Sequence, residues 1–237
     1  MSDVVKVSWS GGKDSTCAVM QHLKIGNTVK VVCYVPMFTE TIPLIAKAHY
    51  EFILRTADLF RSLGAEVHVV TGKTYYDYVT HRSTRGKFKG RAFGFPCFIR
   101  GQCGFKRDSK LKALAQCSVG AYDYEDIGIA ADETDRHAQL TPHKRSILCE
   151  LGITEKQAKA FCTEYHILSP HYDLRNRDGC VLCPNAPASE RERERWFKDY
   201  PEAIPLVMEL QEFVKRERPD QTPLRNYRWF IEEGVTA

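Results

Sequence analysis

The sequence predicts an α/β protein: a doubly wound, mostly parallel sheet with helices on both faces, followed by a helical C-terminal extension that carries cysteines. Short β-branched runs alternate with helix-period segments, a glycine-rich turn joins the first run to the first helix, and the clearest cysteine pair lies late in the chain. A chain of 237 residues is long enough for one such domain with a smaller appendage. We therefore expect the α/β domain at 1–175 and the extension at 176–237, with its helices packed on the same domain.

Strand-like and helix-like segments alternate along the predicted domain. Apolar runs rich in β-branched residues predict buried strands at 4–9, 30–35 and 65–70. Thr154 and Gln157 form a capping-box pattern that predicts the start of a helix. Apolar residues at helical spacing predict helices at 17–23, 44–63, 146–151, 154–166 and after Pro201.

A glycine-rich turn follows the first predicted strand and precedes the first predicted helix. Its glycines let the backbone approach an anion closely, and the first N–H groups of the helix then point at that anion. Lysine and hydroxyl side chains add further donors, so the turn is typical of a nucleotide phosphate site. The spacing fits neither the Walker loop nor the dinucleotide fingerprint, and an ordinary capped turn is the alternative. The candidate binding residues are Ser10, Gly11, Gly12, Lys13, Asp14, Ser15 and Thr16.

A second candidate element is an acidic cluster after a predicted strand at 126–131. Ligands of open α/β sheets bind at the carboxyl ends of the strands, and this cluster occupies such an end. The alternative is a helix N-terminus that is simply enriched in acids. The residues singled out are Asp132, Glu133 and Arg136.

Charge and composition restrict the partners only loosely. The formal net charge is +4, which permits a phosphate-bearing partner without requiring one. The stretch 73–93 interleaves basic residues with aromatics, a mixture that serves either an active-site lid or nucleic-acid binding. A charged run at 190–195 predicts a solvated helix face. We find no secretory signal and no apolar run long enough for a membrane span, so we expect a cytoplasmic protein that does not enter membranes.

The cysteines suggest a metal centre more than a disulfide framework. There are nine, an odd number, beside a nucleotide-type loop. Cys180 and Cys183 form a C-x-x-C pair that supplies half of a metal site, and we nominate Cys97 and Cys103 as the other half. Iron–sulfur, zinc and no metal remain open. The other cysteines lie in apolar patterns and are expected in the core: Cys17, Cys33, Cys117, Cys149 and Cys162.

The loop resembles the S-G-G-x-D-S motif of the PP-loop ATP pyrophosphatases, which have the adenine nucleotide alpha hydrolase-like fold. The acidic element is similar to the G-x-R-x-[DE]-E-[ST]-x-x-R segment of the phosphoadenosine-phosphosulfate-reductase-like branch, with Ala130 in place of the first arginine. The resemblance implies ATP and Mg²⁺ as cofactors. It also implies that Lys13 stabilises the leaving group, that Asp14, Asp132 or Glu133 holds Mg²⁺, and that Arg136 neutralises the substrate or the α phosphate.

The cysteine arrangement is similar to that of assimilatory adenylylsulfate reductases. There, cysteines near the middle of the chain and a later C-x-x-C hold a [4Fe–4S] cluster. In this chain Gly104 follows Cys103, so Cys97 must replace the adjacent cysteine of that family, or one iron is left open. Zinc is the alternative occupant. The nucleophilic cysteine of the reductases' E-C-G-L-H tail has no counterpart after Cys183, which argues against reduction of phosphoadenylyl sulfate by that route.

These motifs lead to three hypotheses. The first is an ATP-binding enzyme that cleaves ATP to AMP and pyrophosphate and so activates a substrate for sulfur transfer to a nucleic acid or a small metabolite. The second is a sulfonucleotide reductase that uses a metal centre. The third is a nucleotide- or RNA-binding module with structural zinc. Candidate partners are a nucleotide substrate, a tRNA or DNA, a sulfur donor such as a cysteine desulfurase, and a second copy of the chain.

Overall fold

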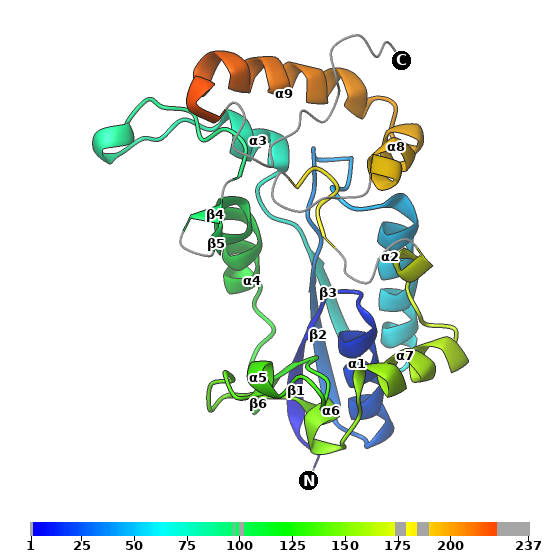
Figure 1. The fold of residues 1–237 in the computed structure, drawn as a ribbon. Coiled ribbons are helices and arrows are strands. Elements are labelled where there is room, and N and C mark those ends of the chain that lie inside the picture. The colour runs from blue at the N-terminus through cyan, green and yellow to red at the C-terminus, as the bar shows by residue number, and fades with distance from the viewer. Residues whose placement is uncertain (1, 97, 100–101, 174–178, 184–189, 222–237) are drawn as a thin grey trace. The chain divides into compact units, whose positions relative to one another are not determined.

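A computed structural model of the chain describes residues 2–96, 98–99, 102–173, 179–183 and 190–221 (Figure 1). The chain divides into two compact units, each assembled from three separate segments. The first unit comprises Met1–Val35, Ala48–Val70 and Leu114–Asp178, and the second comprises Pro36–Lys47, Thr71–Ala113 and Gly179–Ala237. The domain boundary expected between 175 and 176 lies outside the described residues.

The first unit is built on a five-stranded, all-parallel sheet flanked by helices, as expected for the α/β class. Its strand order is β3-β2-β1-β6-β7. The runs predicted as strands at 4–9, 30–35 and 65–70 are confirmed as the first three strands. The strands are β1 (Val4–Trp9), β2 (Thr28–Tyr34), β3 (Glu66–Val70), β6 (Tyr124–Ile127) and β7 (Lys144–Arg145).

The strand expected at 126–131 is shorter than predicted, because β6 ends at Ile127. Gly128 then passes the start of the first helix so closely that a Cβ atom there would lie 2.5 Å from the backbone nitrogen of Ser15. Only glycine fits this approach, and the chain leaves the sheet at that point.

Three helices of the first unit, α1 (Lys13–Lys24), α2 (Lys47–Ser62) and α7 (Glu155–Glu164), lie on the same side of the sheet in Figure 1. The capping box predicted at Thr154 and Gln157 is confirmed at the start of α7. Short helices α5 (Thr134–His137) and α6 (Ile147–Glu150) complete this unit, with a 3₁₀ turn at Pro170–Asp173. An apolar cluster joins α1, α6 and α7: Cys17, Ala18, Ile147, Leu148, Ala158, Cys162 and Ile167.

The second unit is organised around an aromatic core rather than a sheet. Trp196 is 1 % exposed, packs edge-on to Phe38, and donates its Nε1–H to the carbonyl of Pro43 at 2.9 Å. Tyr75 donates its hydroxyl to the carbonyl of Leu182 at 2.9 Å. These contacts explain why 36–47 and 71–113, which we expected within the α/β domain, share a core with 179–221.

The elements of the second unit are mostly helical. A short antiparallel pair joins β4 (Phe98–Ile99) to β5 (Gln102–Cys103). The helix predicted after Pro201 is confirmed as α9, and the charged run lies in α8, which buries Glu192 and Trp196 on its inner side. The helices are α3 (Tyr75–Thr80), a π-helical segment (Lys106–Leu111), α8 (Glu190–Asp199) and α9 (Ala203–Glu217), with 3₁₀ turns at Gly86–Phe88 and Pro219–Gln221. The π-helical segment continues into α4 (Lys112–Gln116), which begins in the second unit and ends in the first. Across the described parts of both units, every helix is too short or too polar to traverse a bilayer.

Candidate functional site

The candidate site lies where the strand order of the first unit changes direction. The chain leaves β1 towards β2 and β3 on one side, while β6 pairs with β1 on the other. Open α/β sheets bind ligands in the crevice outside the carboxyl ends of their strands at such a switch point. The turn Ser10–Thr16 follows β1 and the acidic segment 130–136 follows β6, so the sheet brings both predicted elements to this edge.

Glycine is needed at the first tight point of the turn for two reasons. Gly11 has a φ of +80°, in the left-handed region that other residues rarely adopt. A Cβ atom on Gly11 would also lie 2.8 Å from the Cε1 of His49 and 2.9 Å from the Cγ1 of Ile53. The turn is therefore seated directly against α2, and its path depends on the absence of a side chain.

Hydroxyl groups hold the turn together from inside. The Ser15 hydroxyl donates to the carbonyl of Gly12 at 3.1 Å and accepts from the backbone N–H of Ser10 at 3.2 Å. Thr16 is fully buried, and its Oγ1 accepts from the Nε1–H of Trp9 at 2.9 Å. Both side chains were predicted as ligand-binding residues; in this structure their hydroxyls fix the shape of the loop.

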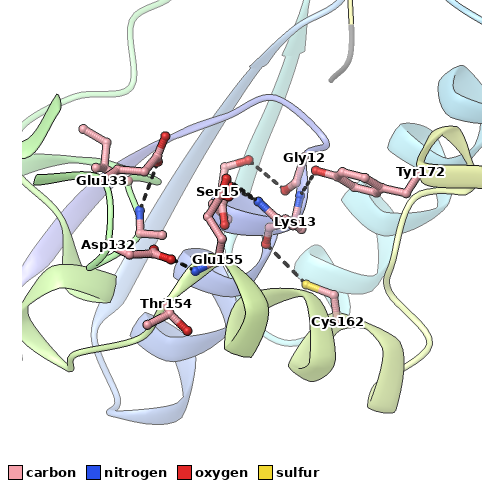
Figure 2. Close-up of polar contacts among 12 residues, drawn as sticks. Gly12, Lys13, Ser15, Asp132, Glu133, Thr154, Glu155, Cys162 and Tyr172 are labelled. Atoms are coloured by element: carbon pink, nitrogen blue, oxygen red, sulfur yellow. Dashed lines mark hydrogen bonds and ion pairs between the residues drawn. The ribbon is translucent and has the colours of Figure 1, made fainter. Parts of the chain in front are cut away.

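The N-terminus of α1 presents backbone donors to the site. The N-cap residue is Gly12, which has no side chain to cap the helix. The N–H groups of the first turn have no partner within a helix and carry its positive dipole end. The backbone N–H of Lys13 donates to the Tyr172 hydroxyl at 2.8 Å (Figure 2). No motif in the sequence indicated that Tyr172 would reach this helix end.

Lys13 lies between two carboxylates. Its ammonium is 2.7 Å from Asp14 Oδ2 and 3.0 Å from Glu155 Oε1. Burial on its own would lower the pKa of Lys13, but the hydrogen bonds to Asp14 and Glu155 outweigh burial and raise it above the ordinary value. Lys13 is therefore held as a cation that points into the acidic side of the site.

Three carboxylates from three different elements converge beside Lys13. One oxygen each from Asp14, Glu133 and Glu155 lie within 4.8 Å of one another. Burial raises the pKa of Asp14 despite the hydrogen bond from Lys13, and the charges of Glu155 and Glu133 push it in the same direction. The Oδ1 of Asp14 is buried and accepts no hydrogen bond from any described residue.

This donor set fits a divalent cation. Oxygen ligands suit Mg²⁺, which keeps several waters and is usually bound through about one or two carboxylates together with phosphate oxygens. A buried carboxylate oxygen without a hydrogen bond is costly unless a cation or a donor reaches it. Asp14, Glu133 and Glu155 are thus the residues that could hold Mg²⁺.

The other predicted acidic and basic residues have supporting positions. Asp132 accepts the backbone N–H of Glu155 at 3.0 Å, so it fixes the start of α7 and orients Glu155 (Figure 2). Arg136 forms an ion pair with Glu133 and is largely exposed. Glu155 was missed as a site residue, although it lies within the recognised capping box; the box predicted a helix start but not what that start faces.

Buried side chains support the turn from behind. Ser169 Oγ lies 2.7 Å from His49 Nδ1 and 2.9 Å from His171 Nδ1, and all three residues are buried beneath the turn at Gly11.

The Cys162 thiol donates to the carbonyl of Lys13 at 3.3 Å. Burial raises the pKa of Cys162 to about 12 and that of Cys17 to about 11, so neither thiol is a nucleophile at neutral pH. Of the cysteines predicted in the core, Cys17, Cys33 and Cys162 are buried, while Cys117 and Cys149 are half-buried.

The cysteines predicted as metal ligands belong to the second unit. Cys103 and Cys180 are half-buried and pack against the same aromatic core. The sulfur atoms of Cys103, Cys180 and Cys183, the three nominated ligands that the structure describes, do not all lie within 4.8 Å of one another. Thiolates around one zinc ion would be about 3.8 Å apart, and a four-iron cluster spaces them more widely. Cys97 lies outside the described residues, so the metal centre stays a prediction.

The basic and aromatic stretch at 73–93 separates into a core part and an exposed part. Tyr75 and Tyr78 are 1 % and 6 % exposed and belong to the aromatic core. They cannot stack on bases, so these two tyrosines do not fit the interpretation of the stretch as a nucleic-acid-binding segment. Phe88, in contrast, is 51 % exposed among lysines and arginines.

No family model matches the chain, and no curated protein matches it either. The functional argument therefore depends on the residues and geometry of the site.

Proposed function

We propose that the first unit binds Mg-ATP at the β1–α1 turn and cleaves it between the α and β phosphates to activate a substrate. One observation carries the proposal: Lys13, the N-terminus of α1 with the glycine N-cap Gly12, and the carboxylates of Asp14, Glu133 and Glu155 converge at the switch point of the sheet. Backbone donors and an ammonium suit polyphosphate oxygens, and a carboxylate group beside them suits the cation that accompanies a nucleotide.

Each residue has a role in this scheme. The N–H groups at the start of α1 hold phosphate oxygens, and Lys13 stabilises the negative charge that develops on the leaving pyrophosphate. Mg²⁺, when bound by Asp14, Glu133 and Glu155, supplies charge neutralisation on the phosphates. Tyr172 fixes the backbone of Lys13, and Asp132 fixes Glu155. A substrate oxygen attacks the α phosphate and pyrophosphate leaves, while Arg136 neutralises the substrate or the α phosphate. Sulfur or another nucleophile then attacks the adenylated substrate and displaces AMP.

The resemblance of the loop to the PP-loop ATP pyrophosphatases supports cleavage at the α phosphate in preference to the γ phosphate. For the acceptor, the substrate that is activated, we propose only a class: a nucleic acid or a small metabolite. The expected products are AMP and pyrophosphate, in contrast to the ADP and phosphate of most other ATPases.

The test compares wild type with Lys13→Ala. We expect ATP binding, measured by calorimetry with Mg²⁺, to weaken about 10- to 100-fold, because a charge-assisted hydrogen bond is worth roughly 1.5–3 kcal/mol. Formation of AMP in the presence of a tRNA, DNA or small-acid acceptor should fall by about 10²–10³. Lys24→Ala, at the other end of the same helix, is the control and should bind ATP like wild type.

Three results would overturn the proposal. The first is equal ATP affinity for wild type and Lys13→Ala, and the second is release of ADP in place of AMP. The third is conversion of a sulfonucleotide without ATP, which would select the reductive hypothesis.

A further inference from the structure

Residues 81–93 of the second unit form a narrow finger, which we call the basic finger. Its two arms are joined by hydrogen bonds from Phe93 N–H to His81 carbonyl at 2.8 Å and from Ser83 N–H to Arg91 carbonyl at 2.9 Å. Gly86 and Gly90 have φ angles of +68° and +82° and turn the chain at the tip, where a 3₁₀ turn spans Gly86–Phe88. Figure 1 shows the finger as the loop that follows α3 and carries a short helical turn at its end.

The finger carries positive charge alone. Between His81 and Phe93 the sequence has five lysines and arginines and no aspartate or glutamate. All five side chains are exposed: Arg82, Arg85, Lys87, Lys89 and Arg91. Positive charges this close together repel one another, which is unfavourable unless a partner of opposite charge approaches them.

Acidic groups neutralise the base of the finger but not its tip. Arg82 is 2.7 Å from Glu217, at the end of α9, and Arg91 is 2.6 Å from Asp220, in the turn that follows. Among the described residues, no carboxylate lies within 4 Å of the cationic groups of Arg85, Lys87 or Lys89. The finger is thus anchored at its base, and three cations at its tip are left for a partner.

An exposed aromatic ring lies among the cations at the tip. Phe88 is 51 % exposed. The Lys87 ammonium lies 5.0 Å from the centre of its ring, and the Arg91 guanidinium lies 5.6 Å from it. An exposed ring beside cations is suited to stacking on a base whose phosphates the cations bind.

We infer that the basic finger is a docking surface for a single-stranded segment of nucleic acid, such as an RNA loop. The tip cations bind phosphates and Phe88 stacks on an unpaired base, which a duplex would not expose. An anionic membrane is disfavoured because a single exposed ring buries little apolar area. An acidic peptide would satisfy the cations but leave the ring without a stacking partner. The inference does not depend on ATP cleavage in the first unit.

The experiment measures binding of a fluorescein-labelled oligouridine by anisotropy over a series of salt concentrations, without ATP. The variant is Arg85→Ala, Lys87→Ala and Lys89→Ala together. Its matched control is Lys24→Ala, Lys47→Ala and Arg55→Ala, which removes one arginine and two lysines at exposed positions outside the finger. Circular dichroism and melting of both variants should match wild type, since none of the six side chains is buried.

We expect the finger variant to bind about 10- to 100-fold more weakly near 0.1 M salt. The slope of log K against log salt should become shallower by about 2, because each phosphate contact on a single strand contributes roughly 0.7. The control should stay within about twofold of wild type, since its three charges lie outside the finger and make none of the proposed phosphate contacts. Equal losses in the two variants would overturn the inference by showing that only net charge matters.

Phe88→Ala separates stacking from charge. We expect it to weaken oligouridine binding about tenfold with an unchanged salt slope, and to leave binding of an RNA duplex unaffected. Unchanged oligouridine binding by both finger variants would overturn the proposal, as would equal competition by polyglutamate. Binding to vesicles that contain phosphatidylserine, lost in the finger variants while oligouridine binding persists, would assign the finger to a membrane instead. Because ATP is absent throughout, none of these results bears on the proposed ATP reaction.

Discussion

Three cysteines of the first unit and three of the second differ in burial, while Cys117 and Cys149 of the first unit are half-buried like those of the second. In the first unit, Cys17, Cys33 and Cys162 are fully buried, and Cys162 contacts the backbone of the β1–α1 turn. In the second unit, Cys103, Cys180 and Cys183 are each only half-buried. The difference separates thiols that pack as small hydrophobic groups from thiols that a metal or a reagent can reach.

The units also differ in what holds their candidate functional residues in place. In the first, the site is made largely of backbone and short polar side chains, and glycines at 11 and 128 allow the close approaches. In the second, the C-x-x-C segment is held by apolar packing, with Val181 and Leu182 buried between its two cysteines. The structure of the first unit should therefore be disrupted when a side chain is added at one of these glycines. That of the second should be disrupted when a buried apolar side chain is truncated.

Thiol labelling tests this comparison directly and has the largest expected effect. Cys162, with a pKa of about 12, has a thiolate fraction at pH 8 about a thousandfold below that of an ordinary thiol, and burial slows its reaction further. In protein treated with a chelator, we expect Cys103, Cys180 and Cys183 to react with iodoacetamide well before Cys17 or Cys162, as measured by peptide mass spectrometry. Complete labelling in urea is the control, and early labelling of Cys162 in the folded protein would contradict the expectation.

The same experiment bears on the predicted metal centre. A thiolate bound to iron or zinc is protected from alkylation, so anaerobically purified protein should label slowly at Cys103, Cys180 and Cys183 until a chelator is added. Labelling that is fast from the start and unaffected by chelation would remove the metal centre from the proposal.

Trp196→Ala is expected to destabilise the second unit selectively. Its ring is buried against Phe38, and its Nε1–H is bonded to Pro43. Truncating a buried tryptophan costs about 3–5 kcal/mol through lost burial and the cavity left behind. Hydrogen exchange should rise in 36–47, 71–96 and 190–217, while the strands of the first unit keep their protection. Trp196→Phe, which retains the packing but not the hydrogen bond, should recover much of the loss, and an equal rise in both units would contradict the expectation.

Sequence patterns predicted the features that are local in the chain. The alternation of strands and helices, the glycine-rich turn and the Thr154 capping box each depend on residues a few positions apart, and the structure contains all three. Glu155 and Tyr172 meet Lys13 across 142 and 159 residues, and no pattern in one sequence encodes such pairings. The second unit was missed for the same reason, since Trp196 and Pro43 are 153 residues apart. Its segments look like loops of the sheet domain until their aromatic residues are seen packed together.

Asp14→Asn should have the smallest effect of these changes, a small shift in melting temperature. Measured with and without Mg²⁺, it distinguishes the contribution of Asp14 to fold stability from its contribution to cation binding. Burial raises the pKa of Asp14 in the folded protein, so the fold binds a proton there more tightly than the unfolded chain does. This carboxyl therefore stabilises the fold below its unfolded pKa, and that contribution is lost as the pH rises through the folded-state pKa. At pH 7 the amide should raise the melting temperature of the metal-free protein by about 1–3 °C, an advantage that disappears in acid.

With magnesium, wild type should melt at a higher temperature than Asp14→Asn, the reverse of the order without metal. A cation that binds the folded state alone stabilises it, so added Mg²⁺ should raise the melting temperature of wild type but leave Asp14→Asn almost unchanged. Asp58→Asn, on the exposed face of α2, is the control and should respond to Mg²⁺ like wild type. A Mg²⁺ response that survives in Asp14→Asn would place the cation elsewhere. A metal-free Asp14→Asn that melts below wild type at pH 7 would show that the ion pair with Lys13 outweighs the burial of the charge.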